Sequence, residues 1–223
     1  MGRKAWQNVG PGREERASIV KKTMTHVYEA RDGLYVNLTN RCPCACTFCL
    51  RQSGDSVGGA DSLWLEREPT LEEVMAAFEA FDVERYREVV FCGYGEPTEA
   101  FDLLVRVARA VKKRYGKPIR VNTNGQGSLI NGRDIAPELA GVVDSVSISL
   151  NSPDAARYQQ IVRSRYGEGA FGGMLDFARE AARYVPEVTL TTVETTLTPE
   201  EEDRCRAICE ELGVRYRIRE WVE

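Results

Sequence analysis

The sequence predicts an α/β fold built on parallel strands, and three observations lead to this prediction. Short runs rich in β-branched and aromatic residues alternate with helical patterns along the chain. The alternation recurs about six times, which favours parallel strands joined by right-handed helical crossovers. Several strands also carry polar side chains between their apolar ones, so helices are expected to cover one face of the sheet while polar groups line the other.

Six strand-like runs, bounded by turn-forming residues, are expected to form the sheet. They are 34–39, 89–92, 119–123, 145–151, 188–193 and 214–221. At their amino-terminal side, residues 25–29 and 34–37 are predicted to pair as a hairpin around Arg31-Asp32-Gly33. Residues 1–24 are polar and lack periodicity, so we expect an N-terminal arm over 1–24 and one core domain over 25–223.

Five helical patterns separate the strands. They cover 70–81, 101–115, 134–142, 171–184 and 198–212. Thr70 with Glu73 matches a capping box, and Thr198 followed by Pro199 is typical of a helix start.

The polar face of the sheet predicts a bound polar ligand. In the strand over 145–151, the side chains of Ser145, Ser147, Ser149 and Asn151 share one side. Barrels without a ligand fill their interior with branched apolar side chains, so these polar groups indicate an interior that holds something polar. An antiparallel sheet with a solvated face is the alternative, and the intervening helices argue against it.

Composition excludes several classes of protein. The chain has 223 residues, a net charge of −4 and no apolar run near the ~20 residues of a membrane span. Nucleic acid is therefore not indicated as a partner, and no membrane association is expected. Seven cysteines, an odd number with several clustered, favour a reducing compartment over a disulfide framework. We expect a cytoplasmic protein.

Three cysteines, Cys42, Cys46 and Cys49, give the strongest chemical signal. Their C-x3-C-x2-C spacing lets three thiolates hold three irons of a cubane cluster and leaves the fourth iron open to a ligand. A zinc site with Cys44 as the fourth ligand is the alternative. No second C-x2-C pair follows and the only histidine, His26, lies upstream, so zinc is the weaker interpretation.

This spacing, with Phe48 directly before the last cysteine, resembles the cluster motif of the radical S-adenosylmethionine (radical SAM) superfamily. The segment after the second predicted strand is similar to the Gly-Gly-Glu motif that holds the amino group of SAM. Here Gly93, Gly95 and Glu96 match, and Tyr94 replaces one residue of the usual pattern.

The ends of the next two strands continue the resemblance. The segments around Asn122 and around Ser149 and Asn151 resemble those that contact the methionine carboxylate and the ribose of SAM. At finer grain, residues 34–43, 63–66 and 68–70 look like the TatD-associated radical SAM proteins.

The resemblance implies a fold, two cofactors and a class of reaction. It implies a partial (β/α)6 barrel with a 4Fe-4S cluster on Cys42, Cys46 and Cys49. Reductive cleavage of SAM at this cluster would give a 5'-deoxyadenosyl radical that takes hydrogen from an unidentified substrate. It also implies an electron donor such as flavodoxin or ferredoxin, and a functional link to a TatD-type hydrolase. An activase that makes a radical on a partner protein is one alternative, and a zinc-binding structural or interaction module is another.

The last predicted strand suggests where a substrate binds. Arg215, Arg217 and Arg219 occupy alternate positions and should share one face. Terminal strands are often charged to prevent pairing with other chains, so a solvated edge is one interpretation. If the row faces the interior, it predicts an anionic substrate, because guanidinium groups match phosphate and carboxylate.

The remaining cysteines and the histidine are expected to serve packing or the surface. Cys205 and Cys209 lie one helical turn apart and should be buried, and Cys44 is expected to be a bystander. Cys92 fits strand packing and a place beside SAM equally well. His26 is predicted to lie on the surface of the hairpin.

Overall fold

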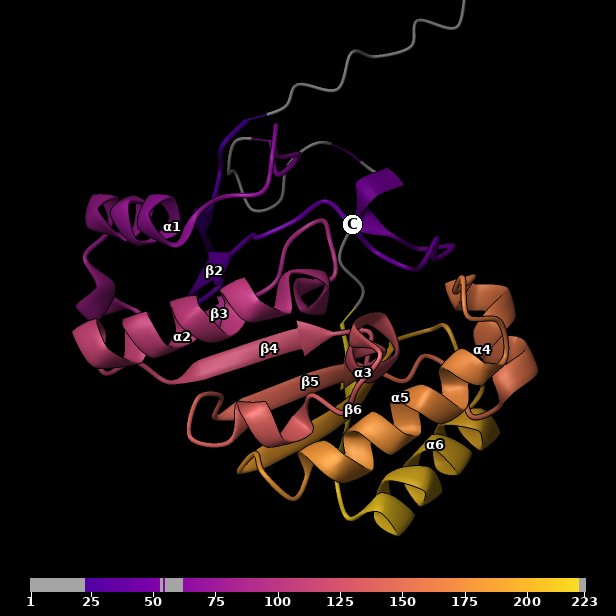
Figure 1. Ribbon diagram of the computed structural model, residues 1–223. Helices are drawn as coiled ribbons and strands as arrows, with labels where there is room; N and C mark the ends of the chain where they lie inside the picture. Colours follow the sequence, from indigo (N-terminus) through magenta and orange to yellow (C-terminus); the bar gives the residue numbers. More distant parts are fainter. Residues whose placement is uncertain (1–22, 53, 55–61, 221–223) are drawn as a thin grey trace, which may run out of the picture.

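The computed structural model describes residues 23–52, 54 and 62–220. Within these residues, seven strands lie side by side in sequence order in one open sheet (Figure 1). The strands are β1 (Val27–Ala30), β2 (Gly33–Val36), β3 (Val89–Phe91), β4 (Ile119–Thr123), β5 (Ser145–Ser149), β6 (Glu187–Val193) and β7 (Arg215–Arg219). β1 pairs antiparallel with β2, and every later neighbour pairs in parallel. The predicted parallel α/β sheet with an N-terminal hairpin is confirmed.

Six α-helices in the described part of the chain connect the parallel strands. They are α1 (Leu71–Ala77), α2 (Phe101–Tyr115), α3 (Gly127–Asn131), α4 (Ala155–Val162), α5 (Gly169–Ala181) and α6 (Pro199–Leu212). Both predicted caps form as capping boxes, Thr70 with Glu73 and Thr198 with Glu201. These caps satisfy backbone N–H groups that the first turn leaves without an intrahelical partner.

The helices cover the apolar face of the sheet, and the core lies between the two (Figure 1). Alternate strand residues such as Phe91, Val121 and Ile148 are buried there against α2 and α5. Cys205 and Cys209 of α6 are 0% and 1% exposed in the same core, as predicted. The opposite, polar face of the sheet is thereby left free to line a site.

Several sequence predictions about elements differ from the structure, among them the strand expected over 34–39, which ends at Val36, and the helix expected over 70–81, which ends at Ala77. The helix expected over 134–142 is wrong: only a 3-10 turn, Ala136–Leu139, forms there. The backbone leaves helical geometry at Ala140, with ψ of 124°, and Gly141 follows in the left-handed conformation, with φ of 69°. The helices α3 and α4, of five and eight residues, were not predicted from the sequence. The strand predicted over 145–151 ends at Ser149, because Asn151 has the left-handed backbone conformation, with φ of 60°.

The amino-terminal part of the chain is described only from Thr23. The predicted arm over 1–24 otherwise lies outside the described residues, as does residue 221, the end of the last predicted strand. Thr23 already pairs with Leu65, and its N–H donates to the carbonyl of Trp64 at 2.7 Å. The prediction that His26 lies on the surface is wrong, because it is 6% exposed. None of the helices in the described part of the chain is long and apolar enough to cross a bilayer.

Candidate functional site

Four loops meet at the carboxyl ends of the parallel strands. The loop after β2 carries the cysteines, the loop after β3 carries Gly93 to Glu96, and those after β4 and β5 carry Asn124 and Asn151. Open α/β sheets bind ligands at this edge, where the ends of parallel strands leave backbone groups unpaired. The candidate site is therefore formed by these four loops.

The cysteine loop is fixed to the end of α4 by backbone hydrogen bonds. Ala45 N donates to the carbonyl of Val162 at 3.1 Å, and Thr47 N donates to the carbonyl of Ile161 at 3.0 Å. Arg165 N donates in turn to the carbonyl of Pro43 at 2.9 Å. This strand-like pairing holds the loop in place although it carries no regular secondary structure.

Cys42, Cys46 and Cys49 are half-buried free thiols on this loop, and Phe48 is half-buried in the turn between the last two. A hydrogen bond from the Cys44 thiol lowers the pKa of Cys42 and of Cys46, while burial raises the pKa of Cys49. Among the described residues, no group of three or more Cys, His, Asp or Glu side chains is arranged around a single ion. In a cubane cluster, each cysteine thiolate binds a different iron.

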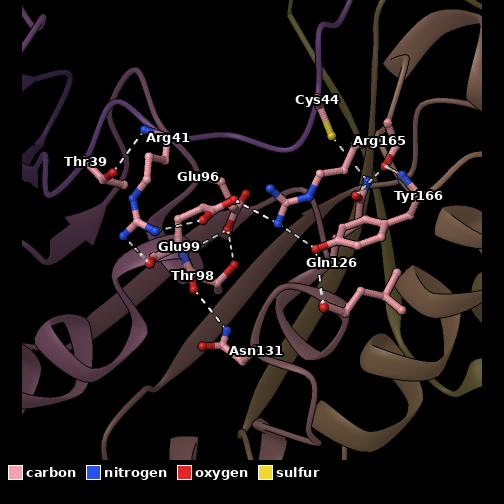
Figure 2. Close-up of polar contacts among 12 residues, drawn as sticks. Thr39, Arg41, Cys44, Glu96, Thr98, Glu99, Gln126, Asn131, Arg165 and Tyr166 are labelled. Atoms are coloured by element: carbon pink, nitrogen blue, oxygen red, sulfur yellow. Dashed lines mark hydrogen bonds and ion pairs between the residues drawn. The ribbon is translucent and has the colours of Figure 1, made fainter.

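The sulfur of Cys44 accepts hydrogen bonds from side chains outside the cysteine loop, and Figure 2 draws Cys44 together with Gln126. Gln126 Nε2 donates to its Sγ at 3.3 Å and Asn124 Nδ2 at 3.5 Å. Gln126 is fully buried and also donates to Tyr158 Oη at 3.0 Å, while its Oε1 accepts from Ser164 Oγ at 2.7 Å. Cys44 therefore connects the cysteine loop to a buried polar network.

The glycines after β3 allow two loops to approach each other. A Cβ on Gly95 would lie 2.2 Å from the carbonyl oxygen of Thr39, and one on Gly93 would lie 2.1 Å from Asn37 Oδ1. Glu96 N then donates to the carbonyl of Arg41, directly before the first cysteine, at 2.8 Å. The glycine loop and the cysteine loop are consequently held as one unit.

Glu96 is 4% exposed and accepts four hydrogen bonds from the protein. Its Oε1 accepts from Thr98 N, Thr98 Oγ1 and Thr123 Oγ1 at 3.1, 2.8 and 2.6 Å, and its Oε2 accepts from Asn124 N at 2.8 Å. Figure 2 shows Thr98 beside this carboxylate. Burial raises the pKa of this carboxyl group, and the four donors oppose that rise. Oε2 accepts only one hydrogen bond from the protein, so it can accept another from a ligand.

Three buried amide oxygens of asparagines lack a hydrogen-bond partner within the described structure. They are Asn37 Oδ1, just after β2, Asn122 Oδ1, in β4, and Asn151 Oδ1, just after β5. Unpaired buried polar atoms are costly, so such atoms at the edge of a sheet are suited to a polar ligand. Ser149, at the end of β5, is half-buried nearby in sequence.

The three arginines of β7 differ in their surroundings. Arg217 Nη2 donates to Ser147 Oγ at 3.4 Å, which places both side chains on the polar face. Arg219 is half-buried on this face, and its Nε is buried without a partner. Arg215 is exposed and forms an ion pair with Glu187 at 2.9 Å near the amino ends of the strands. The structure therefore separates Arg215 from the other two.

Cys92 lies on the polar face rather than in the helix-packed core. Burial raises the pKa of its thiol, whereas a hydrogen bond with Asn122 and the charge of Arg219 lower it. Since Cys92 follows β3 and Arg219 ends β7, the sheet curves enough to bring its distant strands together.

A group of charges borders the cysteine loop, with exposed arginines around the nearly buried side chain of Glu99. Arg41 pairs with Glu68 at 2.6 Å. Arg41 also pairs with Glu99 at 3.1 Å, and Arg165 approaches Glu99 at 3.6 Å (Figure 2). Arg51 lies at the other end of the loop, over the ring of Trp64, and donates to the carbonyl of Tyr94 at 3.2 Å. Screening by solvent limits the contribution of such surface pairs to stability.

The residues present fit a thiolate-bound cluster together with a polar cofactor. Three thiols lie on one fixed loop, those of Cys42, Cys46 and Cys49. The buried side-chain oxygens of Asn122 and Asn151 can each accept a hydrogen bond from a ligand. Sequence reasoning missed Thr98, Thr123 and Gln126, which hold Glu96 and Cys44. Nothing local marks these three residues, because their roles arise from contacts with distant segments.

Comparison with known proteins gives a family and a set of relatives. The model of the radical SAM superfamily matches residues 36–171. GTP 3',8-cyclase 2 of Mycobacterium tuberculosis is 30% identical over 190 residues, which are 84% of this chain and 49% of that protein. Molybdenum cofactor biosynthesis protein 1 of Drosophila melanogaster is 28% identical over 155 residues, covering 70% of this chain and 26% of that protein. The chain spans about half the length of these curated relatives or less.

Solved structures share the fold at low sequence identity. A radical SAM methyltransferase from Sphaerobacter thermophilus matches with a TM-score of 0.61 and 16% identity, over 87% of this chain and 68% of that one. Streptococcus suis SuiB bound to its precursor peptide SuiA matches with a TM-score of 0.60 and 16% identity, over 86% of this chain and 40% of that one. The family model covers more than half of the chain, from β2 through the start of α5, and includes the cysteine loop. The chain therefore belongs to the radical SAM superfamily, whose members are enzymes that bind a 4Fe-4S cluster and SAM.

Proposed function

We propose that this chain is a radical SAM enzyme that holds a 4Fe-4S cluster on Cys42, Cys46 and Cys49 and binds SAM beside it. The observation that carries the proposal is the hydrogen bond from Glu96 N to the carbonyl of Arg41. It joins the glycine loop to the cysteine loop at the carboxyl edge of the sheet. When bound, the reduced cluster and SAM supply a radical that takes hydrogen from the substrate.

The residues of the chain have separate tasks in this proposal. Glu96 would accept a hydrogen bond from the SAM ammonium group through the free position on Oε2. Asn122 and Asn151 would accept from SAM through their unpaired oxygens, with Ser149 beside them. Gly93 and Gly95 permit the close approach of the two loops, and Phe48 lies half-buried in the turn between Cys46 and Cys49.

Within the superfamily, we place the chain with the TatD-associated radical SAM proteins. The support is the likeness of residues 34–43, 63–66 and 68–70. This placement carries a functional link to a TatD-type hydrolase, an electron donor such as flavodoxin or ferredoxin, and a cytoplasmic location. The relatives named GTP 3',8-cyclases make GTP a substrate worth including in assays.

Anaerobic reconstitution tests the proposal directly. The protein should bind about four irons and four sulfides, and it should form 5'-deoxyadenosine from SAM with a strong reductant. Cys46→Ala should form none. Bound zinc without iron, and no 5'-deoxyadenosine, would favour the zinc module instead. With deuterated cell extract, the molecule that loses deuterium to 5'-deoxyadenosine is the substrate. A protein in that role would identify an activase.

A further inference from the structure

Two arginines on the polar face of the sheet have no described acidic partner. Arg217 and Arg219 alternate on β7, so their side chains leave the same face at a spacing of about 6.6 Å. Among the described residues, no carboxylate lies within ion-pair distance of either one, whereas Arg215 on the same strand is paired with Glu187. The strand thus carries two cations that the described protein leaves uncompensated.

The register of the sheet places both arginines on the polar face, where Arg217 is exposed and Arg219 is half-buried. Thr191 pairs with Arg217 and Val193 with Arg219, while Tyr216 and Ile218 take the alternate positions. Tyr216 packs against the helix-covered core, so the arginines face the other way. The contact from Arg217 to Ser147 crosses from β7 to β5 on the polar face.

The surroundings of Arg219 show that it reaches across the sheet. Its charge acts on the thiol of Cys92 at the end of β3, and burial together with Arg217 lowers the pKa of Arg219. The Nε of Arg219 is buried and unpaired. A guanidinium group that has lost water without gaining an acceptor favours a bound anion.

We propose that Arg217 and Arg219 bind a phosphate group of the substrate, with Ser147 donating beside them. This inference rests on the proposed function, since it names the substrate class of that same site. Two uncompensated positive charges match the double negative charge of a phosphate better than a single carboxylate. The planar fork of each guanidinium can grip two phosphate oxygens at once.

Calorimetric titration of the anaerobically reconstituted full chain, saturated with SAM and held at constant ionic strength, tests the inference. The probe is inorganic pyrophosphate, and succinate is the carboxylate comparison. We expect pyrophosphate to bind more tightly than succinate. Arg217→Gln and Arg219→Gln should each weaken pyrophosphate binding by about tenfold or more, since a charge-assisted hydrogen bond is lost. Arg217→Lys should recover part of that loss.

Arg215→Gln is the matched control, because it removes an arginine from the same strand but outside the proposed site, and its pyrophosphate affinity should equal that of the wild type. Circular dichroism confirms that each variant is folded. No pyrophosphate binding by the wild type, equal binding in all variants, or tighter binding of succinate would overturn the inference.

Titration with SAM separates this inference from the proposed function. Arg217→Gln and Arg219→Gln should keep SAM affinity and the reductive formation of 5'-deoxyadenosine. A loss of SAM affinity in Arg219→Gln would assign this arginine to the carboxylate of SAM and overturn the phosphate site. Absence of cluster and SAM cleavage in the wild type would instead refute the proposed function, whatever the result with pyrophosphate.

Discussion

Thr123 Oγ1 donates a hydrogen bond to Glu96 Oε1 at 2.6 Å, and this contact links the ends of β3 and β4. Glu96 was expected from sequence to offer its carboxylate to a cofactor. The structure adds that the carboxylate also organises the loops around it, through Thr98 and Asn124 as well. Substitutions here should therefore change stability together with cofactor binding.

Replacing Glu96 by Gln tests both roles. An amide NH2 would face N–H and O–H donors, so the free energy of unfolding should fall by about 1–3 kcal/mol. SAM affinity, measured by titration, should fall by about ten- to a hundredfold. Thr123→Val removes only one donor and should cost about 0.5–1.5 kcal/mol with a smaller effect on SAM. Unchanged SAM affinity in Glu96→Gln would mean that the cofactor lies elsewhere.

The cluster ligands can be distinguished from the other cysteines. Cys42→Ala, Cys46→Ala and Cys49→Ala should each abolish the intact four-iron cluster, because each removes the thiolate of one iron. Cys44→Ala and Cys205→Ala should retain it. Iron and sulfide assays with visible absorption measure this outcome. Retention of iron in Cys46→Ala with loss in Cys44→Ala would refute the ligand assignment.

Gln126 is expected to matter for stability rather than for ligation. Gln126→Leu leaves Tyr158 and Ser164 without their shared partner in a buried site, so the free energy of unfolding should fall by about 1–3 kcal/mol. Cys44→Ala removes only the contact with sulfur and should cost less. Chemical denaturation provides the comparison, and equal losses in the two variants would show that the sulfur contact dominates.

Gly95 should tolerate no side chain. Gly95→Ala would force a Cβ against the backbone carbonyls of Thr39 and Arg41, and overpacking of this kind costs about 1–3 kcal/mol. The displaced cysteine loop should also bind less iron. Gly172→Ala is the control, since nothing lies within 4 Å of a Cβ there and the residue is inside α5. Its stability should equal or exceed that of the wild type.

His26, the only histidine of the chain, predicts a dependence of stability on pH. Burial lowers its pKa from 6.5 in the folded state. Because the folded pKa lies below the unfolded one, the neutral ring contributes stability above pH 6.5, and this contribution is lost as pH falls through the folded pKa. Over that window the free energy of unfolding should decline by at most about 1.4 kcal/mol per pH unit. His26→Gln should lack this component when denaturation curves are compared from pH 7 to pH 5.

The features of this protein that the sequence predicts well depend on residues that are close together along the chain. The alternation of Ser145 to Ser149 indicated the polar face, whereas the cluster site inferred from the spacing of Cys42, Cys46 and Cys49 stays a prediction. The capping boxes at Thr70 and Thr198 were predicted because their partners lie three residues away. Local geometry fixes such relationships before the chain folds.

The tertiary structure alone decided which distant groups meet. The donors to Glu96, the contacts of Gln126 with Cys44, and the burial of His26 all depend on how loops pack. The sequence placed Arg215, Arg217 and Arg219 on one face, but only the folded chain pairs Arg215 with Glu187 and brings Arg217 to Ser147. These contacts depend on the curvature of the sheet, and a pattern of alternating residues carries no information about that curvature.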